Sequence, residues 1–438
     1  MLRRISYFLV CATPLAATMF YGAVHQPVIA AFYLVIAFIV TFLTLNLWGQ
    51  KEIWISTSLL QLPIWLLCGY AFFQLIPFGS IGPISLDPYS TQITAVHIAA
   101  LAAFFSVALI VINSAERLRR LGTILTIFGC VYAFYAILQS LLSPDAIYGL
   151  YKPQSARPFG SFVNRHDFAA IIEMTIAIPL GLMFVGAVDR DKRLIYVVAV
   201  GVMGTSLLLS GSRGGLVAVI AAVILLVLMT SRAKGARNLV LKAGLSAALL
   251  VAAIGGAVFV GGDTSLTRFS DLAATDNISS SRTHIWRVTL DVIAENFPLG
   301  AGLGAFTQAY AASDTSSGAL RVEQAHNDYL QIVADAGIVG LLLGGFFLVV
   351  FFQAGIRSTA ARDKTLQGLA LGAFAGCFAV LVHSLFDFVL HITAVTLMFL
   401  ILLAVLVAAG RRSDEGVEDV SSVKPANKAT VTPLRRIA

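Results

Sequence analysis

Apolar runs of roughly 17 to 25 residues recur along the sequence, and each is long enough for a helix to cross a hydrocarbon layer about 30 Å thick. A segment that crosses a bilayer must satisfy its own backbone hydrogen bonds, which leaves only helices and closed barrels. Barrel strands are shorter than these runs, at about 9 to 11 residues. The composition agrees, because 58% of residues are hydrophobic and only 12% are charged. We therefore predict an all-α, polytopic membrane helix bundle.

The runs predict about 12 transmembrane helices, at 5–22, 28–48, 53–76, 94–112, 121–142, 167–187, 194–210, 214–230, 243–261, 332–356, 368–386 and 390–409. The first begins with basic residues, as a signal peptide does, but no small-residue cleavage site follows, so we expect it to be retained. Residues 1–409 are predicted to form one integral membrane domain. The polar, periodless segment 410–438 is predicted to be a disordered cytoplasmic tail.

Basic residues predict the orientation. If the N-terminus is cytoplasmic, 22 Lys and Arg fall on the inner side and 8 on the outer side, as the positive-inside rule requires. Both termini are then cytoplasmic. The net charge of +7 is dispersed over loops without an aromatic-interleaved patch, so we expect no nucleic-acid partner. The four cysteines lie inside apolar runs and are expected to be core thiols.

The outer segment 262–331, between the ninth and tenth spans, is too long for a simple connection. Within it, a serine cap at 279–281 precedes a helical pattern that ends before Pro298, so the loop is predicted to be partly helical. Arg282 and Trp286 share one face of this helix near its N-terminus, where anions are favoured. Arg282 can bind a phosphate there, with Trp286 as an interface anchor or a sugar platform. The alternative is a solvated face docked on the bilayer.

Arg213 lies between two spans, at an outer turn rich in glycine and serine. A charged arginine at this depth is costly unless it reaches water or an anion, and the turn leaves backbone N–H groups accessible. This pattern predicts an anion site. The alternative is an arginine that extends to lipid headgroups.

His326 lies at or just before the first turn of the span 332–356. The N-terminal end of a helix disfavours protonation of a histidine, so this residue can accept a proton near neutral pH. Asp328 or Glu323 can orient its ring, and Arg321 is a further candidate helper. The alternative is an ordinary cap or surface histidine.

Several other polar residues invite a role. Arg157, Asn164, Arg165 and His166 lead into the sixth span, with Asn164 placed as a helix cap. Polar groups near or within spans are candidates for function or pairing, and these are Glu173, His383, Asp387 and His391.

Known cofactor and nucleotide motifs do not occur in the sequence. There is no Walker motif, no dinucleotide fingerprint, no zinc-type spacing and no paired acidic motif for a divalent metal. On the outer side of the cytoplasmic membrane there is no ATP. An enzyme that acts there therefore needs a pre-activated donor that the membrane carries. A lipid diphosphate suits the outer arginines, which can hold the leaving diphosphate while a base deprotonates an acceptor hydroxyl.

Four motifs in this order resemble the O-antigen ligase and O-antigen polymerase superfamily. They are "SGSRGG" at 210–215, "SRTHIW" at 281–286, "FPLGAGLGAF" at 297–306 and "AHNDYLQIVADAGIVG" at 325–340. The resemblance implies a GT-C type glycosyltransferase of the bacterial inner membrane with a periplasmic active site. It also implies transfer from undecaprenyl diphosphate with inversion and without a metal or other cofactor.

Matching positions carry the implied roles. Arg213 and Arg282 would contact the diphosphate, with Arg157 and Arg287 as less certain contacts, and His326 would be the base. The acceptor would be lipid A core in a ligase, which we expect first, or another lipid-linked glycan in a polymerase of O-antigen or exopolysaccharide. A transporter or flippase is the alternative from another class, but the halves lack the internal repeat that it predicts.

Overall fold

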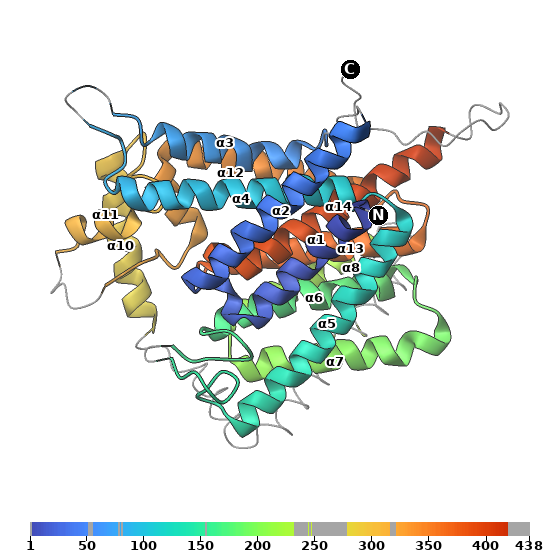
Figure 1. The fold of residues 1–438 in the computed structure, drawn as a ribbon. Helices are drawn as coiled ribbons and strands as arrows, with labels where there is room; N and C mark the ends of the chain where they lie inside the picture. Colours follow the sequence, from blue (N-terminus) through green and yellow to red (C-terminus); the bar gives the residue numbers. More distant parts are fainter. Residues whose placement is uncertain are drawn as a thin grey trace.

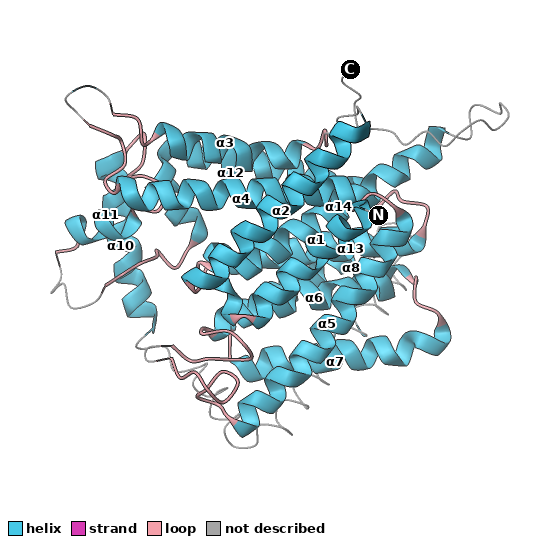
Figure 2. Cartoon of the chain, in the orientation of Figure 1, coloured by secondary structure: helices cyan, strands magenta, loops and turns pink. Residues whose placement is uncertain are grey.

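The computed structural model describes residues 2–50, 56–77, 79, 82–153, 156–231, 244, 247, 278–315 and 321–418 (Figure 1). Its elements are α1 (Leu2–Met19), η1 (Tyr21–Ala23), α2 (Gln26–Gln50), η2 (Leu59–Gln61), α3 (Leu62–Phe73), α4 (Pro88–Val111), α5 (Ala115–Leu142), α6 (Arg165–Val185), η4 (Arg190–Lys192), α7 (Arg193–Ser210), α8 (Arg213–Ser231), α10 (Ile278–Asn296), α11 (Phe306–Ser313), α12 (Asp328–Ser358), α13 (Lys364–His383), η5 (Val389–His391) and α14 (Thr393–Glu418). No strand is present in these ranges, as Figure 2 shows. The predicted all-α class is confirmed.

The described helices account for the predicted spans. Nine are long and apolar enough to cross a membrane, and Arg4–Met19 and Leu59–Phe73 are shorter apolar helices. Together they match every predicted span except the ninth, 243–261, which lies outside the described residues. The chain is therefore a polytopic helical membrane protein.

Helix ends extend beyond the apolar runs wherever a cap starts the helix earlier. The span predicted at 94–112 begins at Pro88, because the Asp87 side chain accepts a hydrogen bond from the Ser90 N–H. The following helix begins at Ala115, where Ser114 caps the Arg117 N–H. At the other end of the chain, α14 continues to Glu418, so the first residues of the predicted tail are helical. Residues 419–438 lie outside the described part.

The centre of the bundle consists of α6, α13 and α14, whose residues are mostly buried (Figure 1). α6 and α13 approach closely because, where they touch, a glycine of one helix lies against the backbone of the other. A Cβ on Gly372 would lie 2.7 Å from the Ala177 carbonyl oxygen, and one on Gly181 would lie 2.4 Å from that of Gly368. Small residues at such contacts let membrane helices pack without a gap. The close packing of this pair places the start of α6 next to the end of α13, and several polar residues lie there.

Two helices of the segment between α8 and α12 form a small core of their own beside the bundle. α10 packs against α11 and α12 through the buried residues Ile285, Val288, Val292 and Phe306, with Trp286 against them. Figure 2 shows α10 and α11 next to one end of the long helices. The predicted partly helical loop is confirmed for its described residues, and α10 is thereby held against the start of α12.

α12 bends at Gly337, whose φ of 57° and ψ of −138° interrupt its helical geometry. A Cβ at this position would lie 2.0 Å from the Pro298 carbonyl oxygen, and the φ is one that side-chain-bearing residues rarely adopt. The bend lets the turn after α10 dock on α12, where the Ile338 N–H donates to the same carbonyl at 2.9 Å.

We expect Gly337→Ala to destabilise the fold by about 2–5 kcal/mol, since it combines backbone strain with a steric clash. Thermal unfolding of the purified protein in detergent would show this as a lower midpoint. Gly344→Ala is the matched control on the same helix, because a Cβ there meets nothing within 4 Å. An alanine at Gly344 should leave the midpoint unchanged or raise it slightly. Equal midpoints for both variants would contradict this account of the bend.

Candidate active site

The polar centre of the molecule is the carboxylate of Asp387, which lies in the turn between α13 and η5. Its Oδ1 accepts hydrogen bonds from His326 Nδ1 at 3.0 Å and from the Phe388 N–H at 3.1 Å. Its Oδ2 accepts one from the Arg282 guanidinium at 3.2 Å. The side chain is only 3% exposed, so these contacts replace its hydration. One buried carboxylate thus joins two of the predicted site residues.

Asp387 is negatively charged in this setting. Burial by itself would raise the pKa of its carboxyl, but the hydrogen bond from His326 and the charge of Arg282 outweigh burial and hold the pKa well below its usual range. The fixed negative charge lies directly against the imidazole of His326. The pair can therefore accept a proton at the ring and stabilise the cation that forms.

His326 is held by its backbone as well as by its ring. Its φ of 51° is left-handed, and the next residue, Asn327, caps α12 by accepting hydrogen bonds from the Tyr329 and Leu330 N–H groups. The ring stands edge-on to Phe388, with centroids 4.9 Å apart. Because Nδ1 is tied to Asp387, Nε2 is the nitrogen that can take a proton from a substrate. The side chain is 32% exposed, which leaves it accessible.

Arg213 is the first residue of α8 and is exposed. Its neighbour Ser212 hydrogen-bonds through Oγ to His166 Nδ1 at 2.9 Å, and this same nitrogen lies 3.9 Å from Asp387 Oδ2. The turn that carries Arg213 is thus connected to the carboxylate through His166. The starts of α6, α8, α10 and α12 and the end of α13 meet at this centre.

A second buried pair lies behind it. His383, at the end of α13, pairs through Nδ1 with Glu173 on α6, and its ring stands edge-on to His166 with centroids 6.3 Å apart. His166, His383 and Asp387 offer ligand atoms within 4.8 Å of one another and could hold a metal ion. In this structure, however, the Asp387 oxygens and His166 Nδ1 already have protein partners. We therefore assign the Asp387 carboxylate and His166 Nδ1 to hydrogen bonding, while the buried Nε2 of His383 has no partner among the described residues.

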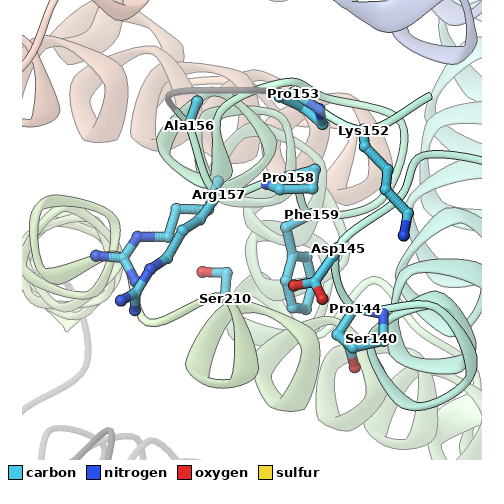
Figure 3. A pocket seen from close by; sticks show the side chains of 11 residues that line it. Ser140, Pro144, Asp145, Lys152, Pro153, Ala156, Arg157, Pro158, Phe159 and Ser210 are labelled. Atoms are coloured by element: carbon cyan, nitrogen blue, oxygen red, sulfur yellow. The ribbon is translucent and has the colours of Figure 1, made fainter.

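The other predicted residues lie apart from Asp387. Arg157 is exposed and lines a cavity beside the α7–α8 turn (Figure 3). Arg287 is exposed on α10, and five residues from Arg282 correspond to about 140° around a helix axis. Trp286 packs on the small core beside α10, and its indole N–H has no hydrogen-bond partner among the described residues. Asn164 caps α6 as predicted, accepting from the His166 N–H at 3.1 Å.

The candidates for orienting His326 have other partners. Glu323 pairs with Arg321 at 3.2 Å on an exposed stretch of chain. Asp328 accepts hydrogen bonds from His391 Nδ1 at 2.8 Å and from Ser384 Oγ at 2.7 Å. The carboxylate on His326 belongs instead to Asp387, which is 61 residues away in the chain. The only signal for this residue in the sequence is an acidic group beside an apolar span.

The helices and this site define a class of protein: a polytopic helical membrane protein with a histidine, an arginine and a shared carboxylate at one end. Residues 198–344, about a third of the chain, match the family model described as "O-Antigen ligase". The predicted resemblance to the O-antigen ligase and polymerase superfamily is thereby confirmed for these residues. The matched region contains Arg213, Arg282 and His326, whereas Asp387 lies beyond it. A search of curated proteins finds no significant match.

Proposed function

We propose that this protein transfers a glycan from undecaprenyl diphosphate to an acceptor at the periplasmic face of the bacterial inner membrane, with lipid A core as the acceptor. The observation that carries the proposal is the shared carboxylate of Asp387, which holds the proton acceptor His326 and the anion-binding Arg282 together. The family match supports a role of the ligase or polymerase type. Both termini are proposed to be cytoplasmic, and residues 1–409 to form the membrane domain.

The proposed reaction is a single displacement. Arg282 and Arg213 bind the diphosphate of the donor, and His326 Nε2 takes the proton of the acceptor hydroxyl. The acceptor oxygen bonds to the anomeric carbon as the bond from that carbon to the diphosphate breaks, so the configuration inverts. Asp387 stabilises the imidazolium, and the arginines stabilise the charge on the departing diphosphate. Arg157 and Arg287 are left as outlying contacts for longer parts of the substrates.

A gene deletion separates ligation from polymerisation. Loss of all O-chain from an intact core, with accumulation of lipid-linked polymer, is the result expected for a ligase. A single repeat left on the core would show an O-antigen polymerase, and loss of secreted polymer alone would show an exopolysaccharide polymerase. Lipopolysaccharide electrophoresis and exopolysaccharide measurement read these outcomes directly. Unchanged glycans of every kind would overturn the proposed function.

We expect transfer by the purified protein to need no metal ion. The ligand atoms of Asp387 and His166 are engaged by Arg282, His326 and Ser212, so an ion would have to displace these partners. Activity should be unchanged, within about twofold, after treatment with EDTA and after later addition of magnesium or zinc. A loss in EDTA that zinc restores would instead assign His166, His383 and Asp387 as metal ligands.

A further inference from the structure

A cavity of about 510 Å³ lies beside the candidate active site, within the range of about 300–1,000 Å³ that is typical of ligand sites. It is enclosed by the loop between α5 and α6 and by the end of α7. Figure 3 shows Arg157 on one side, Asp145 and Lys152 on the other, and Ser210 and Phe159 between them. Ser210 is two residues from Ser212, which connects to Asp387 through His166. The cavity therefore adjoins the proposed place of transfer.

The charges of this cavity are unbalanced. Lys152, Arg157 and Arg165 contribute three cations to its lining, and Asp145 contributes one carboxylate. Lys152 and Arg157 are exposed, and neither forms an ion pair with a residue in the described part of the chain. In the proposed orientation, both also lie on the side of the membrane that the positive-inside rule disfavours for basic residues. Figure 3 shows their charged ends at opposite edges of the lining, so each cation can hold an acidic group on a bound glycan.

The rest of the lining does not suit a bare phosphate. Asp145 would repel a diphosphate, whereas a carboxylate is a good acceptor for sugar hydroxyls. Three prolines and Phe159 supply apolar walls, whereas the buried Ser210 hydroxyl already donates a hydrogen bond to the Leu207 carbonyl at 2.6 Å. A sugar ring presents both an apolar C–H face and a rim of hydroxyls. The combination of cations, one carboxylate and flat apolar surface therefore fits a ring that carries its own negative charge.

We propose that this cavity binds an anionic sugar ring, such as a hexuronate, of one of the two glycans that the protein joins. Arg157 binds the acidic group of the ring and Lys152 that of a neighbouring ring, Asp145 accepts hydrogen bonds from ring hydroxyls, and the prolines pack against the ring face. The assignment of the ring to a transferred or accepting glycan rests on the proposed function. The binding of the ring itself does not depend on it.

The test uses the full-length protein in nanodiscs and two probes of equal length, tetragalacturonate and its fully methyl-esterified form. We expect the acid to bind at least about tenfold more tightly than the ester, by calorimetry, with a difference that shrinks as salt screens the charges. Lys152→Gln and Arg157→Gln should each remove most of this difference. Lys192→Gln, the same change on an exposed lysine at the far end of α7, should leave it intact. An unfolding midpoint for each variant verifies that the protein is folded.

Several results would overturn the proposal: no preference for the acid in the unaltered protein, a preference that persists in Lys152→Gln and Arg157→Gln, or equal weakening of both probes. In a transfer assay with uronate-bearing glycans, the same variants should raise one KM, and the substrate concerned identifies which glycan carries the ring. His326→Ala should keep the preference while it loses transfer. If the protein prefers the acid but transfers no glycan, the sugar site is supported and the proposed function is wrong. If the protein transfers glycan but shows no preference for the acid, the proposed function is supported and the sugar site is wrong.

Discussion

Asp387→Asn is expected to reduce glycan transfer by about 10²–10⁴-fold, the range over which acid–base catalysis contributes to enzyme rates. The amide keeps the size of the side chain but removes the negative charge that holds His326 and Arg282. The imidazolium that forms during reaction would then lose its stabilising partner, and the ring could adopt the wrong tautomer. Initial rates with a lipid-linked donor in nanodiscs measure the effect.

The matched control is Asp363→Asn, at the opposite end of α13. Asp363 also pairs with a cation, Arg119, but it caps the start of α13, the end of that helix opposite to the active site. This variant should transfer glycan at the normal rate. If the Asp387→Asn variant transferred glycan at the normal rate and was present in the membrane at normal abundance, Asp387 would have no role in the mechanism.

We also expect Asp387→Asn to change how the stability of the protein depends on pH. The pKa of Asp387 is lowered in the folded protein, so its charge stabilises the fold at pH values above about 3.9, the usual pKa of an unfolded aspartate. That contribution is lost as the pH falls from there toward the folded pKa. The difference in unfolding midpoint between the unaltered protein and Asp387→Asn should therefore be full at pH 6 to 7 and narrow below pH 4.

His326→Ala is expected to lower the rate constant for transfer by about 10²–10⁴-fold while leaving donor affinity nearly unchanged. The variant removes the proton acceptor, but Arg282 and Arg213 remain to bind the diphosphate. Added imidazole should restore part of the rate, because a free base can enter the space that the side chain leaves. Rescue separates proton transfer from a purely positioning role, which imidazole would not replace.

His284→Ala on α10 is the control for His326→Ala, since it removes a half-exposed histidine that pairs with Asp314. Its transfer rate should be close to normal. Arg282→Ala gives the complementary result, a raised KM for the donor, because it removes a proposed diphosphate contact. If His326→Ala retained full activity, or raised only the donor KM, the assignment of a base would be wrong.

Much of this protein follows from its sequence because the determining forces act locally. A run of apolar residues of bilayer length forms a helix wherever it lies, so the spans were predictable from hydrophobic length. The cap at Asn164 and the helix that carries Arg282 follow from neighbours a few residues away. The four motifs, read together, pointed to the superfamily whose model matches residues 198–344.

The tertiary structure alone decided which charged groups meet. Asp328 and Glu323 are near His326 in sequence, yet the chain returns after α13 and places Asp387 on the ring instead. Arg282 reaches that carboxylate across 105 residues. Such pairings depend on the close packing of α6 and α13, which their glycines allow, and on the contact of α10 with α12. A single sequence determines where polar groups enter the chain, but the packing of distant helices determines which of them share a proton.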